Sequence, residues 1–236
     1  MKYTDKHKVL SQFTDAQGNL RAGAILRYMQ EAAANAMAAD GMSYDALAAQ
    51  GRVFVISKIT LSIYSDIHAN EEIEVETWAT ESARASFNRA YRVVRGGSVV
   101  AEAVSVWALV DVQRKRLVTV ADAALPYRED APLDLELPAR IPIQSDSLVL
   151  VDERRVRYSD IDRNRHMNNT VYADMLCDYV FRTGAGRISK MSISYINEAP
   201  LGCELKVYFC ADDDTYYIRT VREDGKINCE AEIILA

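Results

Sequence analysis

The chain has 236 residues, of which 49% are hydrophobic and 26% are charged, the usual balance of a globular protein. Its net charge of −6 argues against nucleic acid as the main partner, because nucleic-acid binding usually requires a strong basic field. No apolar run approaches the length that crosses a bilayer, so we expect no membrane-spanning segment and no membrane partner.

The N-terminal stretch and the cysteine usage predict a cytoplasmic protein. The N-terminal stretch MKYTDKHKVLSQF lacks the apolar core of a signal peptide. The four cysteines, at positions 177, 203, 210 and 229, lie in the second half and form no Cys-x-x-Cys pair. A reducing cytoplasm therefore fits best.

The first half is predicted to contain an amphipathic helix followed by antiparallel strands. Ile25, Met29, Ala33 and Met37 recur at spacings of three to four residues, which is typical of a helix with one apolar face. Strands are predicted at 56–64, at 71–79, where Ile and Val alternate with Glu, and at 98–112. The pair Gly96-Gly97 predicts a tight turn before the last of them.

Residues 121–147 are predicted to form a linker, because they contain four of the five prolines, at positions 126, 132, 138 and 142. We therefore expect an N-terminal domain at 1–120 and a C-terminal domain at 148–236.

The second half repeats the pattern of the first. ISKMSISYI at 188–196 resembles ISKITLSIY at 56–64, and Val171, Met175 and Tyr179 predict a helix before it. Strands are predicted at 204–210 and 226–236, with a turn at Asp224-Gly225. The sequence therefore predicts an α+β duplication in which each sheet wraps its own helix and the two sheets join edge to edge. Two independent domains on a linker are the alternative.

The loop before the second helix, DIDRNRHMNNTVY, is the candidate catalytic segment. Aligning Asp162 with Asp15 places Asn164 opposite Gln17 and His166 opposite Asn19, so only the second loop has an imidazole. His166 can change charge near neutral pH, Asn164 can donate to a carbonyl and accept from a water, and Asp162 can orient either side chain.

The helix N-terminus after this loop could stabilise the oxyanion of a thioester or ester. Capping of that helix is the alternative function for Asn168 or Asn169. One His with scattered carboxylates does not make a typical zinc site, so we expect no metal.

The chain resembles the acyl-acyl-carrier-protein (acyl-ACP) thioesterases of plant plastids and their bacterial relatives. Their Asp-x-Asn-x-His-Val-Asn-Asn motif with a following Tyr is similar to DRNRHMNNTVY at 162–172. TWATESARASFNRAYRV at 77–93, SVWALVDVQRKRL at 105–117 and Pro-Tyr at 126–127 resemble further family segments.

The resemblance implies a double hot-dog fold that hydrolyses fatty acyl-ACP, with the acyl chain in the N-terminal half and the chemistry in the C-terminal half. It implies no cofactor and no metal, and acyl carrier protein as the partner. Asn168 and Asn169 are then expected at the substrate, with Met29, Ala33 and Met37 beside the acyl chain. A homodimer is left open.

The chain departs from the plant pattern at one position. The plant enzymes carry Glu followed by Cys after the His, whereas here Glu198 is followed by Ala199. We therefore expect Glu198, not a thiol, to activate water, and we do not expect Cys203 to be a nucleophile.

The acidic partner requires a local basic patch. Arg154 and Arg155, with Arg157, Arg163 and Arg165, are the first candidate for it, and Arg114, Lys115 and Arg116 are the second. A solvated surface is the simpler explanation of both runs. Three other functions share parts of these features: a single hot-dog acyl-CoA thioesterase, a hot-dog dehydratase and a non-catalytic acyl-binding module.

Overall fold

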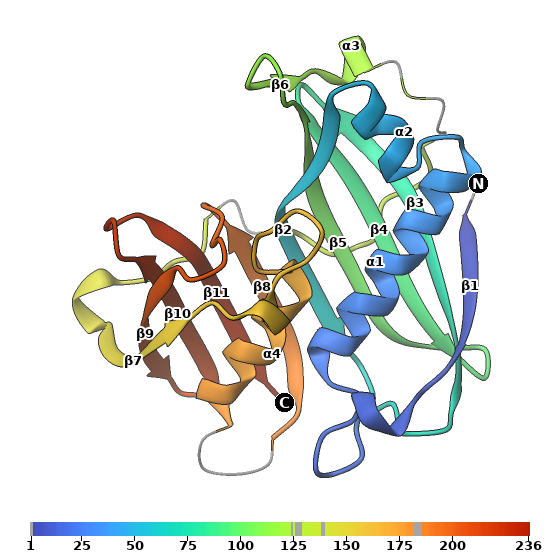
Figure 1. Ribbon diagram of the computed structural model, residues 1–236. Coiled ribbons are helices and arrows are strands. Elements are labelled where there is room, and N and C mark those ends of the chain that lie inside the picture. Colours follow the sequence, from blue (N-terminus) through green and yellow to red (C-terminus); the bar gives the residue numbers. More distant parts are fainter. Residues whose placement is uncertain (1, 124, 126–128, 138–139, 182–185) are drawn as a thin grey trace. The chain divides into compact units, whose positions relative to one another are not determined.

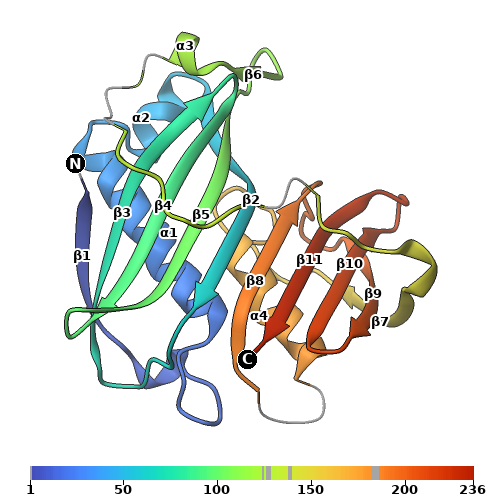
Figure 2. The same cartoon turned by 180° about the vertical axis from the view of Figure 1, so that it is seen from behind.

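The computed structural model describes residues 2–123, 125, 129–137, 140–181 and 186–236. The chain divides into two compact units, Met1–Leu20 with Ala24–Leu137 (unit 1) and Arg21–Gly23 with Pro138–Ala236 (unit 2). Each unit is an antiparallel sheet with one long helix on one face (Figures 1 and 2).

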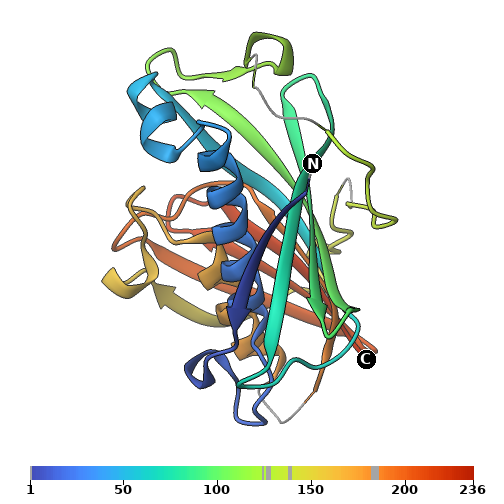
Figure 3. The ribbon, with the colours of Figure 1, turned by 90° about the vertical axis from the view of Figure 1, so that its right-hand side faces the viewer.

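Unit 1 has the sheet order β1-β3-β4-β5-β2, with β6 added to β5. Figure 3 shows its long helix, α1, on one side of this sheet. The elements of the unit are β1 (Tyr3–Lys8), a 3-10 turn (Ser11–Phe13), α1 (Ala22–Ala39), α2 (Tyr44–Ala49), β2 (Arg52–Ile63), β3 (Glu72–Ala83), β4 (Ser86–Arg95), β5 (Ser98–Asp111), β6 (Arg116–Val118) and α3 (Val120–Ala123).

Unit 2 has the sheet order β7-β9-β10-β11-β8. Its elements are a 3-10 turn (Ser145–Ser147), β7 (Val149–Arg155), a second 3-10 turn (Tyr158–Asp160), α4 (Asn169–Val180), β8 (Ile188–Tyr195), β9 (Glu204–Asp212), β10 (Thr215–Arg222) and β11 (Ile227–Leu235).

The hydrophobic patterns of the sequence explain both helices. In α1, Ile25, Met29 and Ala33 are buried, and Met37 near the end of the helix is half-buried. In α4, Met175 and Tyr179 are buried, while Val171 is half-buried. The predicted apolar faces are therefore the faces that pack into each core.

The predicted duplication is confirmed by matching contacts within the two sheets. In unit 1, Arg92 Nη2 lies 2.7 Å from Glu102 Oε1, between β4 and β5. In unit 2, Arg219 Nη2 lies 2.6 Å from Glu230 Oε1, between the corresponding strands β10 and β11. Both predicted turns are also present. Gly96 and Gly97 have φ of 57° and 82°, and Gly225 of the second turn has a φ of 79°.

Two local features differ from the sequence-based expectations. Helix α2, which Ser43 caps by accepting from the Ala46 N–H at 3.2 Å, was not predicted. Part of the expected linker is bonded to β3, because Asp130 N–H donates to Ala79 O and the Trp78 indole donates to Ala131 O, both at 2.9 Å. The linker can bond to this part of β3 because the pairing of β1 with β3 ends at Thr77.

The other linker prolines, Pro132 and Pro142, are described, whereas Pro126 and Pro138 lie outside the described residues, as does Tyr127 of the resemblance. No helix among the described residues is long and apolar enough to cross a membrane.

Candidate functional site

The loop between β7 and α4 is anchored by a buried ion pair at its start. Asp160 is 6% exposed, and its carboxylate lies 2.7 Å from Arg154 Nη2 and accepts from the Arg157 N–H at 2.9 Å. The Asp160 carbonyl accepts from the Asn168 N–H at 2.8 Å, which closes the loop. Asp160 therefore fixes both ends of the segment that carries the candidate residues.

Asp162 folds the middle of this loop into a turn. Its Oδ1 accepts from the Asn164 N–H at 2.8 Å, and its own N–H donates to His166 O at 3.1 Å. Arg165 takes the left-handed conformation that the turn requires, with a φ of 65°. Asp162 Oδ2 accepts from Asn168 Nδ2 at 3.2 Å. These bonds show that Asp162 supports the loop backbone and Asn168; that it also orients the side chain of Asn164 or His166 stays a prediction.

Unit 1 contains the same turn without the imidazole. Asp15 Oδ1 accepts from the N–H groups of Gln17 and Asn19, each at 2.9 Å, and Gly18 takes the left-handed position with a φ of 83°. The alignment of Asp15 with Asp162 is therefore confirmed. Because the aspartate is common to both turns, the chemical difference between the loops lies at Asn164 and His166.

His166 and Glu198 lie side by side although they are far apart in the sequence. Glu198 Oε2 is 3.1 Å from His166 Nε2, and the two side chains are 64% and 34% exposed. The pairing follows from the backbone, because Met167 N–H donates to Ala199 O at 2.9 Å and His166 forms a bridge with Pro200. An imidazole in contact with a carboxylate, both open to water, can move protons to and from a reacting group.

The matching backbone contact in unit 1 carries different side chains. Leu20 N–H donates to Ile67 O at 2.7 Å, and Asn19 forms a bridge with His68. This places Asn19 at the position of His166 and Asp66 at the position of Glu198. Unit 1 therefore has the scaffold of the pair but not the imidazole that would complete it.

Asn168 is the cap of α4. Its Oδ1 accepts from the Thr170 N–H at 2.9 Å and from the Thr170 hydroxyl at 2.7 Å. Asn169, the first residue of the helix, accepts from the Tyr195 hydroxyl through its carbonyl at 2.9 Å. The side chain of Asn168 is thus engaged in capping and in the turn, which was the alternative to the expected place at the substrate.

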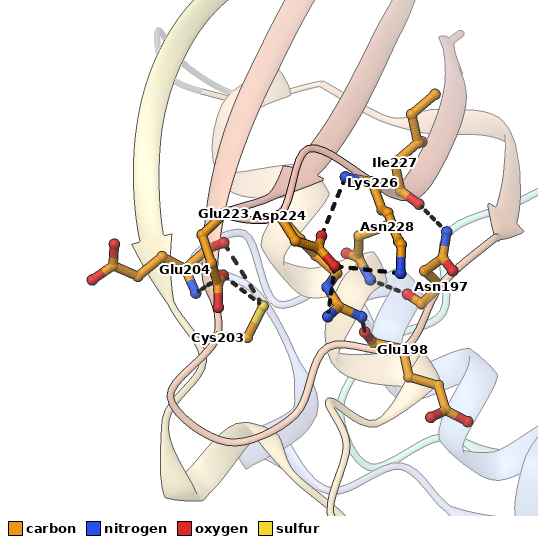
Figure 4. Close-up of polar contacts among 10 residues, drawn as sticks. Asn197, Glu198, Cys203, Glu204, Glu223, Asp224, Lys226, Ile227 and Asn228 are labelled. Atoms are coloured by element: carbon orange, nitrogen blue, oxygen red, sulfur yellow. Dashed lines mark hydrogen bonds and ion pairs between the residues drawn. The ribbon is translucent and has the colours of Figure 1, made fainter.

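Cys203 is separate from this pair. Its thiol is buried and donates to Glu223 Oε2 at 3.2 Å, and burial together with this bond raises its pKa to about 12. Figure 4 shows the Glu198 carboxylate pointing away from Cys203. Ala199, where the plant enzymes carry a cysteine, is fully buried. The thiol has neither the ionisation nor the position of a nucleophile beside His166.

The remaining predicted residues lie in two places. Met29, Ala33 and Met37 share one face of α1 in unit 1. Arg155 is exposed and donates from Nε to Gly202 O at 3.2 Å, whereas Arg154 is engaged with Asp160. Arg154 was expected in a docking patch, but its guanidinium anchors the loop. Among the described residues, no group of three or more His, Cys, Asp or Glu could hold a metal ion.

Sequence reasoning missed three residues that organise the site. Asp160 stands in the quoted loop but carried no signal apart from its charge. Arg222 donates from Nη1 to Glu198 O at 2.9 Å, and the side chain of Asn228 donates to the carbonyl of Asn197. Both come from strands distant in sequence, so only the folded chain brings them to this place.

Comparisons with known proteins identify two family models along the chain. The model described as the acyl-ACP thioesterase N-terminal domain matches residues 1–126, and the model of the C-terminal domain matches residues 144–235. Among curated proteins, the palmitoyl-acyl carrier protein thioesterase of Cuphea hookeriana is 23% identical over 165 residues, which are 63% of this chain and 39% of that protein. The oleoyl-acyl carrier protein thioesterase 2 of Arabidopsis thaliana is 24% identical over 193 residues, 72% of this chain and 52% of that protein.

Solved structures show the fold. The structure of an acyl-ACP thioesterase from Bacteroides thetaiotaomicron matches with a TM-score of 0.90 at 22% identity. The match covers 100% of this chain and 98% of the Bacteroides chain. The 12:0-ACP thioesterase from Umbellularia californica has a TM-score of 0.87 at 16% identity, covering 100% and 97%. The chain therefore has the α+β double hot-dog fold of these structures.

Proposed function

Because the chain belongs to the acyl-ACP thioesterase family, we propose that it hydrolyses the thioester between a fatty acyl chain and the phosphopantetheine arm of acyl carrier protein. The observation that carries the proposal is the contact of 3.1 Å between His166 and Glu198, beside the N-terminus of α4. The release of a free fatty acid would end chain elongation.

In the proposed reaction, Glu198 accepts a proton from a water molecule while the water oxygen attacks the thioester carbonyl carbon. His166 and Asn164 position the water or the carbonyl, and the N-terminus of α4 stabilises the oxyanion of the tetrahedral intermediate. The C–S bond then breaks, which releases the fatty acid and the phosphopantetheine sulfur. The sulfur receives the proton that Glu198 had accepted and leaves as a thiol. The side chain of Asp162 keeps the turn in shape and takes no proton.

The test of this proposal is turnover of the purified protein on acyl-ACP thioesters from short to long chains, with the matching acyl-CoA thioesters alongside. We expect hydrolysis of acyl-ACP with a higher kcat/KM than of acyl-CoA. Preference for acyl-CoA would make the protein an acyl-CoA thioesterase, and hydration of an enoyl thioester would make it a dehydratase. Binding of acyl groups without turnover would overturn the proposal.

We further propose that unit 1 binds the acyl chain along the α1 face that contains Ala33. Small side chains leave room beneath a sheet, and Met29 can adapt to a flexible apolar ligand. Ala33→Phe should therefore shift the preferred acyl chain to a shorter length, because the ring fills space that the chain would occupy. The measurement is kcat/KM across the chain-length panel.

The matched control for this test is Ala34→Phe, which adds the same ring to the exposed face of the same helix. The control should leave the chain-length profile unchanged. A folded, active Ala33→Phe variant with the profile of the unmodified protein would place the acyl chain elsewhere.

We propose that Arg155 belongs to the surface that receives acyl carrier protein, because it is exposed and lies beside the loop where phosphopantetheine must enter. Arg155→Glu should raise KM for acyl-ACP and flatten its dependence on salt, since charges at a rim act mainly on association. Hydrolysis of a small acyl-pantetheine thioester should be nearly unchanged.

Arg116→Glu is the control, because it makes the same change of charge at an exposed arginine of the second basic run in unit 1. The docking proposal fails if Arg155→Glu slows both substrates equally, or if Arg116→Glu has the same effect on KM for acyl-ACP.

A further inference from the structure

A buried polar network distinguishes the core of unit 2 from that of unit 1. Each unit has a β-bulge, at Val100 in β5 and at Asn228 in β11, where the strand ladder skips one residue. In each unit, the carbonyl of the bulge residue accepts hydrogen bonds from two successive backbone N–H groups. Residues 64 and 65 donate to Val100 O, and residues 196 and 197 donate to Asn228 O. Asn228 is therefore the counterpart of Val100.

The same correspondence extends to two neighbours. Thr220 and Val93 are the residues at which the ladders shift in β10 and β4. Tyr172 and Ile25 are both the fourth residue of their helices. The six side chains are all at most 3% exposed: Ile25, Val93 and Val100 in unit 1, and Tyr172, Thr220 and Asn228 in unit 2.

The three polar side chains of unit 2 bond to one another. Asn228 Oδ1 accepts from the Thr220 hydroxyl at 2.8 Å, and Asn228 Nδ2 donates to the Tyr172 hydroxyl at 2.9 Å. Burying these groups costs free energy unless every bond is made. Unit 1 shows that an apolar trio fills the same positions, so the fold itself does not require the network.

The network leads to the residue before Glu198. Asn228 Nδ2 also donates to the carbonyl of Asn197, and Asn197 Nδ2 donates to Ile227 O at 2.7 Å (Figure 4). Arg222 Nη1 also donates to the carbonyl of Glu198, at 2.9 Å. Arg95 makes the equivalent bond to Asp66 O in unit 1, so the arginine contact is common to both units. The Asn228 contact has no equivalent there, because valine cannot donate.

We propose that Asn228, held by Thr220 and Tyr172, is a positioning residue that fixes the turn at Asn197 so that the Glu198 carboxylate meets His166. This proposal rests on the proposed function, which makes that pair the reacting groups. Asn228 is buried beneath the turn and acts through the backbone. A misplacement of the carboxylate by about 1 Å can cost about 10²-fold in rate, which sets the scale of the expected effect.

The test replaces the network by groups of similar volume that cannot hydrogen-bond, in the variant Tyr172→Phe/Thr220→Val/Asn228→Val. We expect kcat for acyl-ACP to fall about 10²-fold while KM stays unchanged, because the network positions the carboxylate and does not bind substrate. The ¹⁵N resonance of His166 Nε2 should move toward its position in Glu198→Ala, which removes the contact outright. Val93→Thr introduces a buried hydroxyl at the matching position of unit 1. This control should change neither kcat for acyl-ACP nor the His166 Nε2 resonance.

The measurement of kcat and the ¹⁵N resonance of His166 separate this proposal from the proposed function. If the unmodified protein hydrolyses no acyl thioester, the proposed function fails. The His166 resonance still tests whether Asn228 positions the Glu198 carboxylate against His166. If the triple variant does not fold, Tyr172→Phe alone should lower kcat about fivefold through the loss of one bond and move the resonance in the same direction. A folded variant with an unchanged His166 resonance would overturn the proposal, whatever its kcat.

Discussion

Replacing Glu198 with alanine is expected to lower kcat for acyl-ACP hydrolysis by about 10²–10⁴-fold, the contribution of a positioned general base. The carboxylate lies 3.1 Å from His166 and is open to the water that it would deprotonate. Steady-state kinetics on one acyl-ACP substrate, with far-UV circular dichroism to confirm folding, measures the effect. Because Glu198 is exposed, the substitution should cost little stability.

Two control variants sharpen this result. Asp66→Ala removes the carboxylate at the matching position of unit 1 and should leave kcat unchanged. Cys203→Ala removes a thiol whose pKa is raised by burial and by its bond to Glu223, so that it stays protonated near neutral pH, and this variant should also remain active. An inactive Cys203→Ala, or an acyl group trapped on Cys203, would refute the water mechanism.

Arg154→Ala is expected to lower the free energy of unfolding by about 3 kcal/mol, because it leaves the Asp160 carboxylate buried without its cation. Asp160 is 6% exposed and closes both ends of the loop, while Arg154 is about a quarter exposed, so we take the low end of the range for buried pairs. The midpoint of urea unfolding, monitored by fluorescence, measures the change.

Arg155→Ala is the control for that prediction, because it removes an exposed arginine from the next position of the same strand. Its cost should stay within about 0.5 kcal/mol. Equal shifts of the urea midpoint for the two variants would show that the Arg154–Asp160 pair does not anchor the loop. Arg154 is engaged with the buried Asp160, whereas Arg155 is exposed, so Arg155 is the residue with which to test docking.

The sequence by itself was sufficient for the features that depend on neighbouring residues. The spacing of Ile25, Met29 and Ala33 predicted the buried face of α1, and the pair Gly96-Gly97 predicted the turn before β5, because periodicity and turn geometry are local properties. The alignment of Asp15 with Asp162 was also local, since each aspartate folds its own turn within a few residues.

Only the tertiary structure decided which side chains meet. His166 faces Glu198 because a backbone bond between Met167 and Ala199 joins segments that are distant in the sequence. Burial likewise separates Arg154 from Arg155, two adjacent arginines that look alike in the sequence. The side-chain bonds of Asn228 depend on a strand bulge and on a helix residue far away. Partners and burial follow from long-range packing, which a local pattern does not encode.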